Sequence, residues 1–170
     1  MKKSFLLFAF FTLVFSACKK SSTTTPTFDP AVQAKIDDDK IQAYLKANPS
    51  ITATKDPSGL YYQIIAQGSG TAPTVNSNVR VAYRGTLLDG TQFDTNANFS
   101  HKLGPTTDNN GNIVDLGLIK GWQIGIPFIK PGGRILLIIP SALGYGNNPQ
   151  SGIPANSVLV FTIDLFAVQG

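Results

Sequence analysis

Residues 79–94 read VRVAYRGTLLDGTQFD and set the architecture of the chain. In residues 79–84 apolar and polar side chains alternate, which is typical of a strand with one buried face. The sequence LLDG at residues 87–90 follows as a turn signal. The stretch therefore predicts a half-buried strand that ends in a tight turn.

Segments on both sides of this stretch predict more strands. Strand-forming residues bounded by turn residues recur at 60–65, 134–139 and 157–168. Only residues 119–128 could form a central helix, and Gly125 and Pro127 keep it short. The composition agrees, because 16 glycines and 11 prolines favour a turn-rich domain over a helical bundle. We therefore predict an α+β fold, with an antiparallel sheet covering one short helix.

A further helix is predicted ahead of the sheet, over residues 29–48. Apolar residues recur there with helical spacing, and Asp29 before Pro30 fits an N-cap with proline in the first turn. Residues 37–39 are three aspartates, which we expect to lie largely on the solvent side, because a metal loop would need further oxygen ligands. The length of this helix favours packing on the domain, or dimerisation, over a free helix.

The first 17 residues have the pattern of a secretory signal peptide. Lys2 and Lys3 precede an apolar stretch, residues 5–15, that is too short to span a bilayer. Residues 15–18 read FSAC and resemble the bacterial lipobox, in which the cysteine is lipidated and becomes the new N-terminus. We therefore predict a lipid anchor at Cys18 that holds the protein in the bacterial cell envelope. An ordinary signal peptide followed by an incidental cysteine is the alternative.

These patterns divide the chain into four regions: a signal peptide (1–17), a flexible tether (18–27), a helical extension (28–58) and a main domain (59–170). The tether is rich in Lys, Ser and Thr and cannot bury an apolar face. Without Lys2 and Lys3 the net charge falls from +4 to +2, and the only arginines, at positions 80, 84 and 134, are isolated. We expect no nucleic-acid partner, because no basic stripe could follow a phosphate backbone.

Six short segments occur in a fixed order: VAYRGTL (81–87), DGTQFD (89–94), IKGW (119–122), PGGR (131–134), LGYG (143–146) and IPANSVLVF (153–161). Together they resemble the FKBP family of peptidyl-prolyl cis/trans isomerases, over residues 59–170. The resemblance implies a twisted antiparallel sheet wrapped around a short helix, with a shallow apolar pocket between them. The preceding helix resembles the N-terminal extensions of some bacterial members.

The resemblance also implies which residues form the substrate pocket. Its catalytic residues would be Tyr83, Phe93, Asp94, Trp122, Tyr145 and Phe161, and its substrate-binding residues Phe99, Leu118, Ile119 and Ile153. Trp122 would form the floor, and Asp94 would turn its carboxylate inward from the rim. The amide N–H of Ile119 and the hydroxyl of Tyr145 would bind substrate carbonyls. Taken singly, Phe93, Phe99 and Phe161 would more often be core residues, and Tyr83 and Tyr145 could be ordinary half-buried tyrosines. The inference therefore depends on the whole set.

The implied activity is isomerisation of Xaa-Pro bonds in unfolded or extended polypeptides, which would assist the folding of exported proteins. It needs no cofactor and no metal, and macrolides are the implied inhibitors. A non-catalytic chaperone or binding module for proline-containing segments is the alternative. His101 is the only histidine, Cys18 the only cysteine, and glutamate is absent. The sequence therefore lacks the residues needed for a nucleophile–histidine site, for a zinc site or for the acid pair of a glycosidase.

Two segments depart from the family pattern. Residues 105–116 insert a polar stretch, which we expect to form an extra turn or hairpin beside the pocket, either as decoration or as a limit on substrate choice. Residues 146–153 are slightly shorter than usual, lack a histidine often found there and carry Gly152 before Ile153 in place of a branched residue. We therefore expect weaker macrolide binding, with the amide-rotation site mostly intact.

Overall fold

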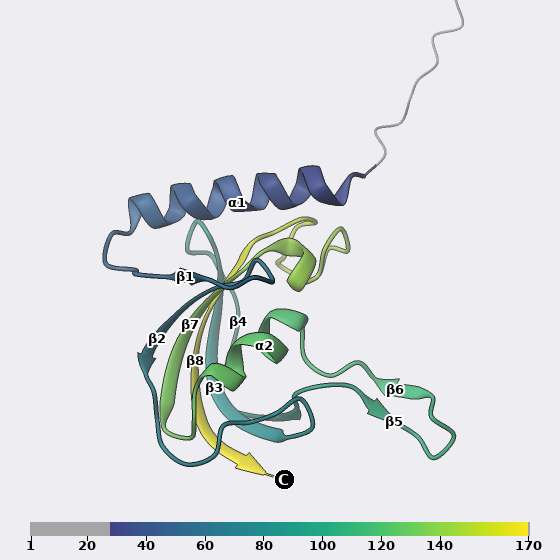
Figure 1. Ribbon diagram of the computed structural model, residues 1–170. Coiled ribbons are helices and arrows are strands. Elements are labelled where there is room, and N and C mark those ends of the chain that lie inside the picture. Colours follow the sequence, from purple (N-terminus) through teal and green to yellow (C-terminus); the bar gives the residue numbers. More distant parts are fainter. Residues whose placement is uncertain (1–27, 170) are drawn as a thin grey trace, which may run out of the picture.

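The computed structural model describes residues 28–169, and their main feature is a six-stranded antiparallel sheet (Figure 1). Its strands lie in the order β1 (Thr54–Lys55), β2 (Tyr61–Ala66), β7 (Gly133–Ile139), β8 (Leu159–Gln169), β3 (Asn78–Leu87) and β4 (Gln92–Lys102). Every neighbouring pair is antiparallel, which confirms the predicted sheet. The predicted signal peptide, the tether and Cys18 lie outside the described residues.

The stretch at residues 79–94 forms the hairpin of β3 and β4. Val79 and Val81 are buried while Arg80 between them is exposed, as the alternation predicts. The turn is closed by Leu87, whose N–H donates to the Thr91 carbonyl at 2.9 Å. Gly90 has a φ of +87°, a left-handed conformation that glycine adopts without a steric penalty.

The central helix α2 (Lys120–Gly125) packs on the concave face of the sheet and continues into the 3₁₀ helix η1 (Ile126–Phe128). This confirms the short helix predicted between residues 119 and 128. Close approach to β7 requires glycine, because a Cβ at Gly121 would lie 2.6 Å from the Ile139 side chain. A Cβ at Gly125 would lie 2.5 Å from the Leu137 side chain. Trp122 and Ile126 face the core between helix and sheet.

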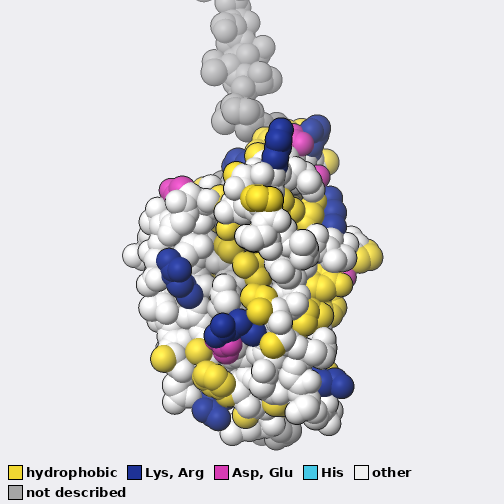
Figure 2. Space-filling view, turned by 90° about the vertical axis from the view of Figure 1, so that its left-hand side faces the viewer, with side chains coloured by type: hydrophobic (Ala, Val, Ile, Leu, Met, Phe, Trp, Pro, Cys, Tyr) yellow, Lys and Arg dark blue, Asp and Glu magenta, His cyan; other side chains and the backbone are white. Residues whose placement is uncertain are grey.

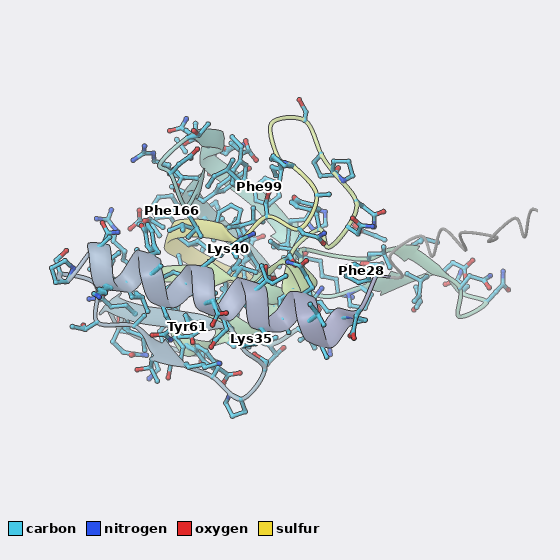
Figure 3. The ribbon with its side chains drawn as sticks, turned by 90° about the horizontal axis from the view of Figure 1, so that it is seen from above. Phe28, Lys35, Lys40, Tyr61, Phe99 and Phe166 are labelled. Carbon is cyan, nitrogen blue, oxygen red and sulfur yellow. The ribbon has the colours of Figure 1, made fainter. Side chains whose placement is uncertain are left out.

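The predicted N-terminal helix is present as α1 (Pro30–Ala47), with Asp29 as its N-cap. The Asp29 carboxylate accepts a hydrogen bond from the N–H of Ala31 at 2.8 Å. The helix packs across the end of the sheet, with Tyr61 beneath it (Figure 3). A second apolar cluster joins α1 to the sheet and the segment before β8, and its buried members are Ile41, Tyr61, Ile138, Val158 and Val160.

The prediction that residues 37–39 lie largely on the solvent side is wrong for Asp37. Its side chain is buried, with 1% of the residue exposed, whereas Asp39 forms an exposed pair with Lys35. Asp37 precedes Ile41 by one helical turn, so the two residues share the face that packs on the domain. Asp38 lies at the boundary, where it pairs with Lys55 at 2.6 Å and accepts a hydrogen bond from the Tyr61 hydroxyl at 2.6 Å.

The insertion at residues 105–116 forms a two-stranded hairpin, β5 (Thr106–Thr107) and β6 (Ile113–Asp115), as predicted. It projects from the body of the domain (Figure 1) and exposes Ile113, Val114 and Leu116. At its base, His101 on β4 lies 3.4 Å from the Asp115 carboxylate and stacks on the ring of Phe99.

On the face of the molecule shown in Figure 2, lysine and arginine side chains are scattered, and some of them lie beside acidic side chains. They do not gather into a stripe on that face. Hydrophobic side chains extend there from the upper part of the view to the middle of the face.

We predict that Ile41→Ala lowers the free energy of unfolding by about 2–5 kcal/mol, because it leaves a cavity in the cluster under α1. Urea denaturation would measure the change. The matched control is Val32→Ala, since Val32 on the same helix is 56% exposed, and its effect should stay within about 0.5 kcal/mol. Equal, small effects of both substitutions would show that α1 does not pack on the sheet in solution.

Candidate active site

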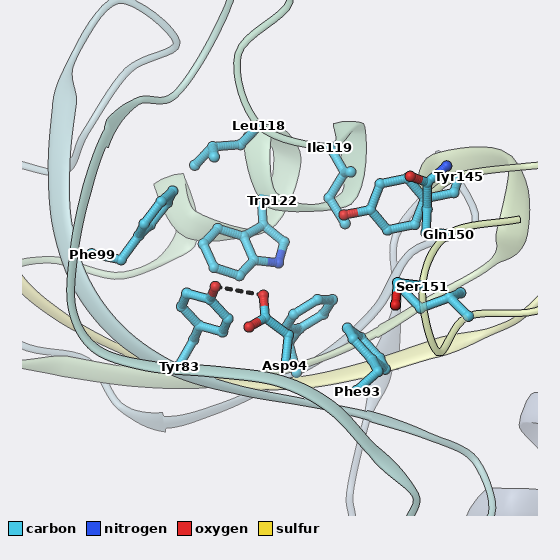
Figure 4. A pocket seen from close by; sticks show the side chains of 12 residues that line it. Tyr83, Phe93, Asp94, Phe99, Leu118, Ile119, Trp122, Tyr145, Gln150 and Ser151 are labelled. Carbon is cyan, nitrogen blue, oxygen red and sulfur yellow. Dashed lines mark hydrogen bonds between the residues drawn. The ribbon is translucent and has the colours of Figure 1, made fainter. Parts of the chain in front are cut away.

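A cavity of about 450 Å³ lies between α2 and the strands β3, β4 and β8 (Figure 4). Its lining consists of Tyr83, Phe93, Asp94, Phe99, Leu118, Ile119, Trp122, Tyr145, Gln150, Ser151, Ile153 and Phe161. All ten residues that the resemblance assigned to a pocket are therefore brought together around one cavity. They come from the hairpin of β3 and β4, from the N-terminal end of α2, from β8 and from the loop after η2 (Ser141–Leu143).

The floor and walls of the cavity are aromatic rings packed edge to face. The ring of Trp122 lies 5.0 Å from that of Tyr83 and 5.1 Å from that of Phe161, at interplanar angles of 79° and 89°. The Phe93 ring lies 5.5 Å from the Phe161 ring at 82°. This arrangement brings ring edges against ring faces, which is electrostatically favourable and restricts side-chain motion. The aromatic lining of the cavity is therefore largely in place before any ligand enters.

Gly85 on β3 makes room for two of these rings. A Cβ at this position would lie 2.7 Å from both the Phe161 and the Phe93 ring. Any larger residue would clash with both rings, so glycine at position 85 is a steric requirement of the cavity walls.

A hydrogen bond across the mouth of the cavity orients the only carboxylate in its lining. The Tyr83 hydroxyl donates to Asp94 Oδ2 at 2.6 Å, and the N–H of Thr95 donates to Asp94 Oδ1 at 2.8 Å. Burial, together with the hydrogen bond and the charge of Asp94, raises the pKa of the Tyr83 phenol well above its usual range. The phenol therefore stays protonated at neutral pH and holds one carboxylate oxygen toward the cavity (Figure 4).

Two hydrogen-bond donors at the rim are available to a ligand. Neither the amide N–H of Ile119 nor the hydroxyl of Tyr145 has an acceptor within residues 28–169. Burial and the nearby charge of Asp94 raise the pKa of the Tyr145 phenol, so this group also remains a donor at neutral pH. The Trp122 indole N–H is a third donor without a partner in the described chain, but it is buried in the floor. The cavity thus combines apolar aromatic walls with a few donors.

Sequence reasoning missed two lining residues, Gln150 and Ser151. They belong to a tight turn in which the N–H of Gln150 donates to the Ile153 carbonyl at 2.9 Å and the N–H of Ile153 donates back at 3.0 Å. Gly152 closes this turn with a φ of +74°. Their position in the sequence could have identified them, because they come just before Ile153. A tight turn at this point brings its tip residues to the rim of the cavity.

The family model described as FKBP-type peptidyl-prolyl cis-trans isomerase matches residues 69–166 of the chain. The chain belongs to this family. Among the FKBP-type isomerases that it resembles, FkpA of Escherichia coli K12 is 41% identical over 112 residues, which cover 66% of this chain and 38% of FkpA. Mip of Coxiella burnetii is 35% identical over 134 residues, which cover 77% of this chain and 54% of Mip.

Solved structures agree with the sequence relatives. The crystal structure of FkpA from Escherichia coli matches with a TM-score of 0.63 and 33% identity, over 82% of this chain and 63% of that one. A peptidyl-prolyl cis-trans isomerase from Pseudomonas syringae matches with a TM-score of 0.62 and 25% identity, over 85% of this chain and 99% of that one. The chain spans about two fifths to one half of the length of the curated relatives named above.

We predict that alkaline pH destabilises this FKBP-type domain partly through Tyr83. Because folding raises the pKa of its phenol, the stabilising contribution is complete below pH 10 and declines as the pH rises further, by at most about 1.4 kcal/mol per pH unit. Urea denaturation between pH 9 and pH 11.5 should therefore show a shallower decline for Tyr83→Phe than for the unmodified protein. An equal decline in both proteins would contradict the partly buried, hydrogen-bonded phenol.

Proposed function

We propose that this protein is a peptidyl-prolyl cis/trans isomerase that acts on proline-containing segments of unfolded or extended polypeptides. The observation that supports it most directly is the aromatic cavity with Asp94 at its mouth, in a chain of the FKBP family. The ring of a substrate proline and the flanking backbone would fit such a site, because the ring is apolar and the neighbouring carbonyls need hydrogen-bond donors. Macrolide inhibitors would compete for the same cavity.

Rotation about the Xaa-Pro bond has a barrier of about 20 kcal/mol, because the twisted amide loses its resonance. The proposed catalysis is non-covalent. The rings of Trp122, Phe93 and Phe161 take the pyrrolidine into a site with little water, where the planar amide loses the solvation that favours it. An acceleration of about 10⁴-fold requires only about 5.5 kcal/mol of preferential binding to the twisted state.

Asp94 and the rim donors would act on different parts of the substrate. A planar amide carries more negative charge on its carbonyl oxygen than a twisted one, so a carboxylate held nearby disfavours the planar form. Tyr83 keeps the Asp94 carboxylate in place. The Ile119 N–H and the Tyr145 hydroxyl bind carbonyls on either side and hold the backbone in a turned shape. Together these contacts favour the geometry in which rotation occurs.

We predict that the purified protein accelerates Xaa-Pro isomerisation and that Asp94→Ala lowers kcat/KM by on the order of tenfold, about 1.4 kcal/mol of transition-state binding. NMR exchange spectroscopy on short peptides would measure both rates. Asp89→Ala is the matched control, because Asp89 is an exposed carboxylate in the turn of the same hairpin. Its kcat/KM should equal that of the unmodified protein.

The same experiment separates the enzyme from the alternative binding module. No acceleration by the folded protein across several Xaa-Pro peptides, with peptide binding retained, would reject the enzyme and favour a holding function. An equal loss in the Asp94 and Asp89 variants would reject the proposed role of the cavity carboxylate.

We also propose that the protein works in the bacterial cell envelope on exported clients, held to a membrane by a lipid on Cys18. Supporting this are the apolar leader and the FSAC segment that ends at Cys18. Within residues 28–169, no helix is long and apolar enough to cross a membrane.

Cys18→Ser should abolish incorporation of a radiolabelled fatty acid into the protein, because the thiol is the proposed attachment point. Labelling of growing cells followed by immunoprecipitation would measure it. Ser21→Ala, in the same tether, should leave the labelling unchanged. An unlabelled wild-type protein would favour the ordinary signal peptide instead.

A further inference from the structure

Asp37 on α1 is a buried carboxylate that the aromatic cavity does not use. Both of its oxygens accept hydrogen bonds: Oδ1 from the Gln33 amide at 2.7 Å, and Oδ2 from both the N–H and the hydroxyl of Ser141, at 2.8 and 2.6 Å. No ion pair to Asp37 exists among the described residues. Burying a carboxylate without a cation is unfavourable unless hydrogen bonds compensate. Ser141 therefore supplies two of the three hydrogen bonds that compensate the burial of this carboxylate.

Ser141 connects this carboxylate to the candidate active site. Its carbonyl accepts the N–H of Gly144 at 3.0 Å and the N–H of Gly146 at 2.8 Å. These two glycines flank Tyr145, whose hydroxyl is one of the two rim donors. The carbonyl of Gly146 in turn accepts the N–H of Asn156 at 2.8 Å. A continuous series of hydrogen bonds thus runs from α1 to both sides of Tyr145.

The segment has no local substitute for Asp37. Residue 140, just before η2, is a proline, whose side chain offers no acceptor to the Ser141 donors. Within residues 28–169 the Ser141 amide is satisfied by Asp37 alone. An amide without this partner would be buried and unsatisfied, because Ser141 is 1% exposed. Loss of the carboxylate therefore favours other conformations of residues 141–146.

Attachment of α1 does not by itself explain a buried carboxylate. Ile41 and its cluster already hold the helix by apolar packing, and Asp38 adds an ion pair with Lys55. An apolar residue at position 37 would serve attachment without the penalty of desolvating a charge. What an apolar residue could not supply is a fixed acceptor for the two Ser141 donors.

We propose that Asp37 is a positioning residue for the isomerase site, which fixes residues 141–146 through Ser141 and so holds the Tyr145 hydroxyl at the cavity rim. The inference deepens the proposed function and rests on it for its catalytic consequence. It also makes α1 part of the catalytic unit, since an element outside the family match at residues 69–166 sets the geometry of a rim donor.

The first test compares Asp37→Ala with Ile41→Ala in the otherwise unmodified protein. Both substitutions weaken the packing of α1, but only the first removes the acceptor for Ser141. At equal folded fraction, Asp37→Ala should lower kcat/KM for Xaa-Pro peptides about five- to tenfold, and Ile41→Ala should not change it. Asp37→Asn keeps an oxygen acceptor of the same shape and should stay within about threefold of the wild type. Equal kcat/KM losses for Asp37→Ala and Ile41→Ala would overturn the proposal.

A double substitution tests whether the effect passes through Tyr145. If Asp37 acts by placing the hydroxyl, Asp37→Ala should cause no further loss of kcat/KM in a Tyr145→Phe background, because interacting residues are non-additive. Full additivity of the two losses would overturn this route.

Amide hydrogen exchange tests the positioning without relying on activity. Asp37→Ala should speed exchange of the Ser141, Gly144 and Gly146 amides at least tenfold, whereas Ile41→Ala should not do so selectively. If Asp37→Ala does not fold, Ser141→Ala, which removes only the hydroxyl donor, should speed exchange at Gly144 and Gly146 by a smaller factor. Unchanged exchange would overturn the proposal even if the protein is an active isomerase. Faster exchange in a protein that lacks isomerase activity would instead reject the proposed function. It would still support the role of Asp37 in fixing residues 141–146.

Discussion

The short length of α2 is the constraint on which the rest of the structure depends. A helix of six residues is about 9 Å long, whereas a strand of eleven residues, such as β8, extends about 36 Å. The helix therefore covers only part of the concave face that the sheet presents. Gly121 and Gly125 let it sit directly on β7, and Pro127 follows in η1. The uncovered part of the concave face becomes the cavity.

The residues around this uncovered area give it the properties of a binding site. Trp122 belongs to the core and also lines the cavity floor, so the same ring stabilises the fold and would contact the proposed substrate. Edge-to-face packing with Tyr83 and Phe161 restricts its motion. Such a preformed apolar surface suits a reaction that breaks no covalent bond and needs only a few kcal/mol of selective binding. Asp94 adds a single charge, which Tyr83 orients.

The N-terminal helix α1 also supports the cavity, from the end of the sheet across which it packs. Its apolar contacts reach β2, β7 and the segment before β8, while Asp37 reaches the segment that carries Tyr145. The strongly twisted sheet brings these places close together although they are far apart along the chain. The extension and the FKBP-type domain therefore share one packing unit within residues 28–169.

Much of the fold and the cavity follows from the sequence, because their signals are local. Three such signals depend only on neighbours within a few positions: the alternation at residues 79–84, the turn at Asp89 and Gly90, and the cap at Asp29. Eight of the ten pocket positions lie in family motifs that remain in register despite the inserted hairpin, and Phe99 and Leu118 lie between two of these motifs. The burial of Asp37 was decided only by tertiary structure, since its partner Ser141 lies 104 positions away. Gln150 and Ser151 line the cavity for a similar reason, because the turn at Gly152 and its approach to β4 place them there. A contact between distant segments leaves no periodicity in the sequence, so packing alone determines which polar groups it buries.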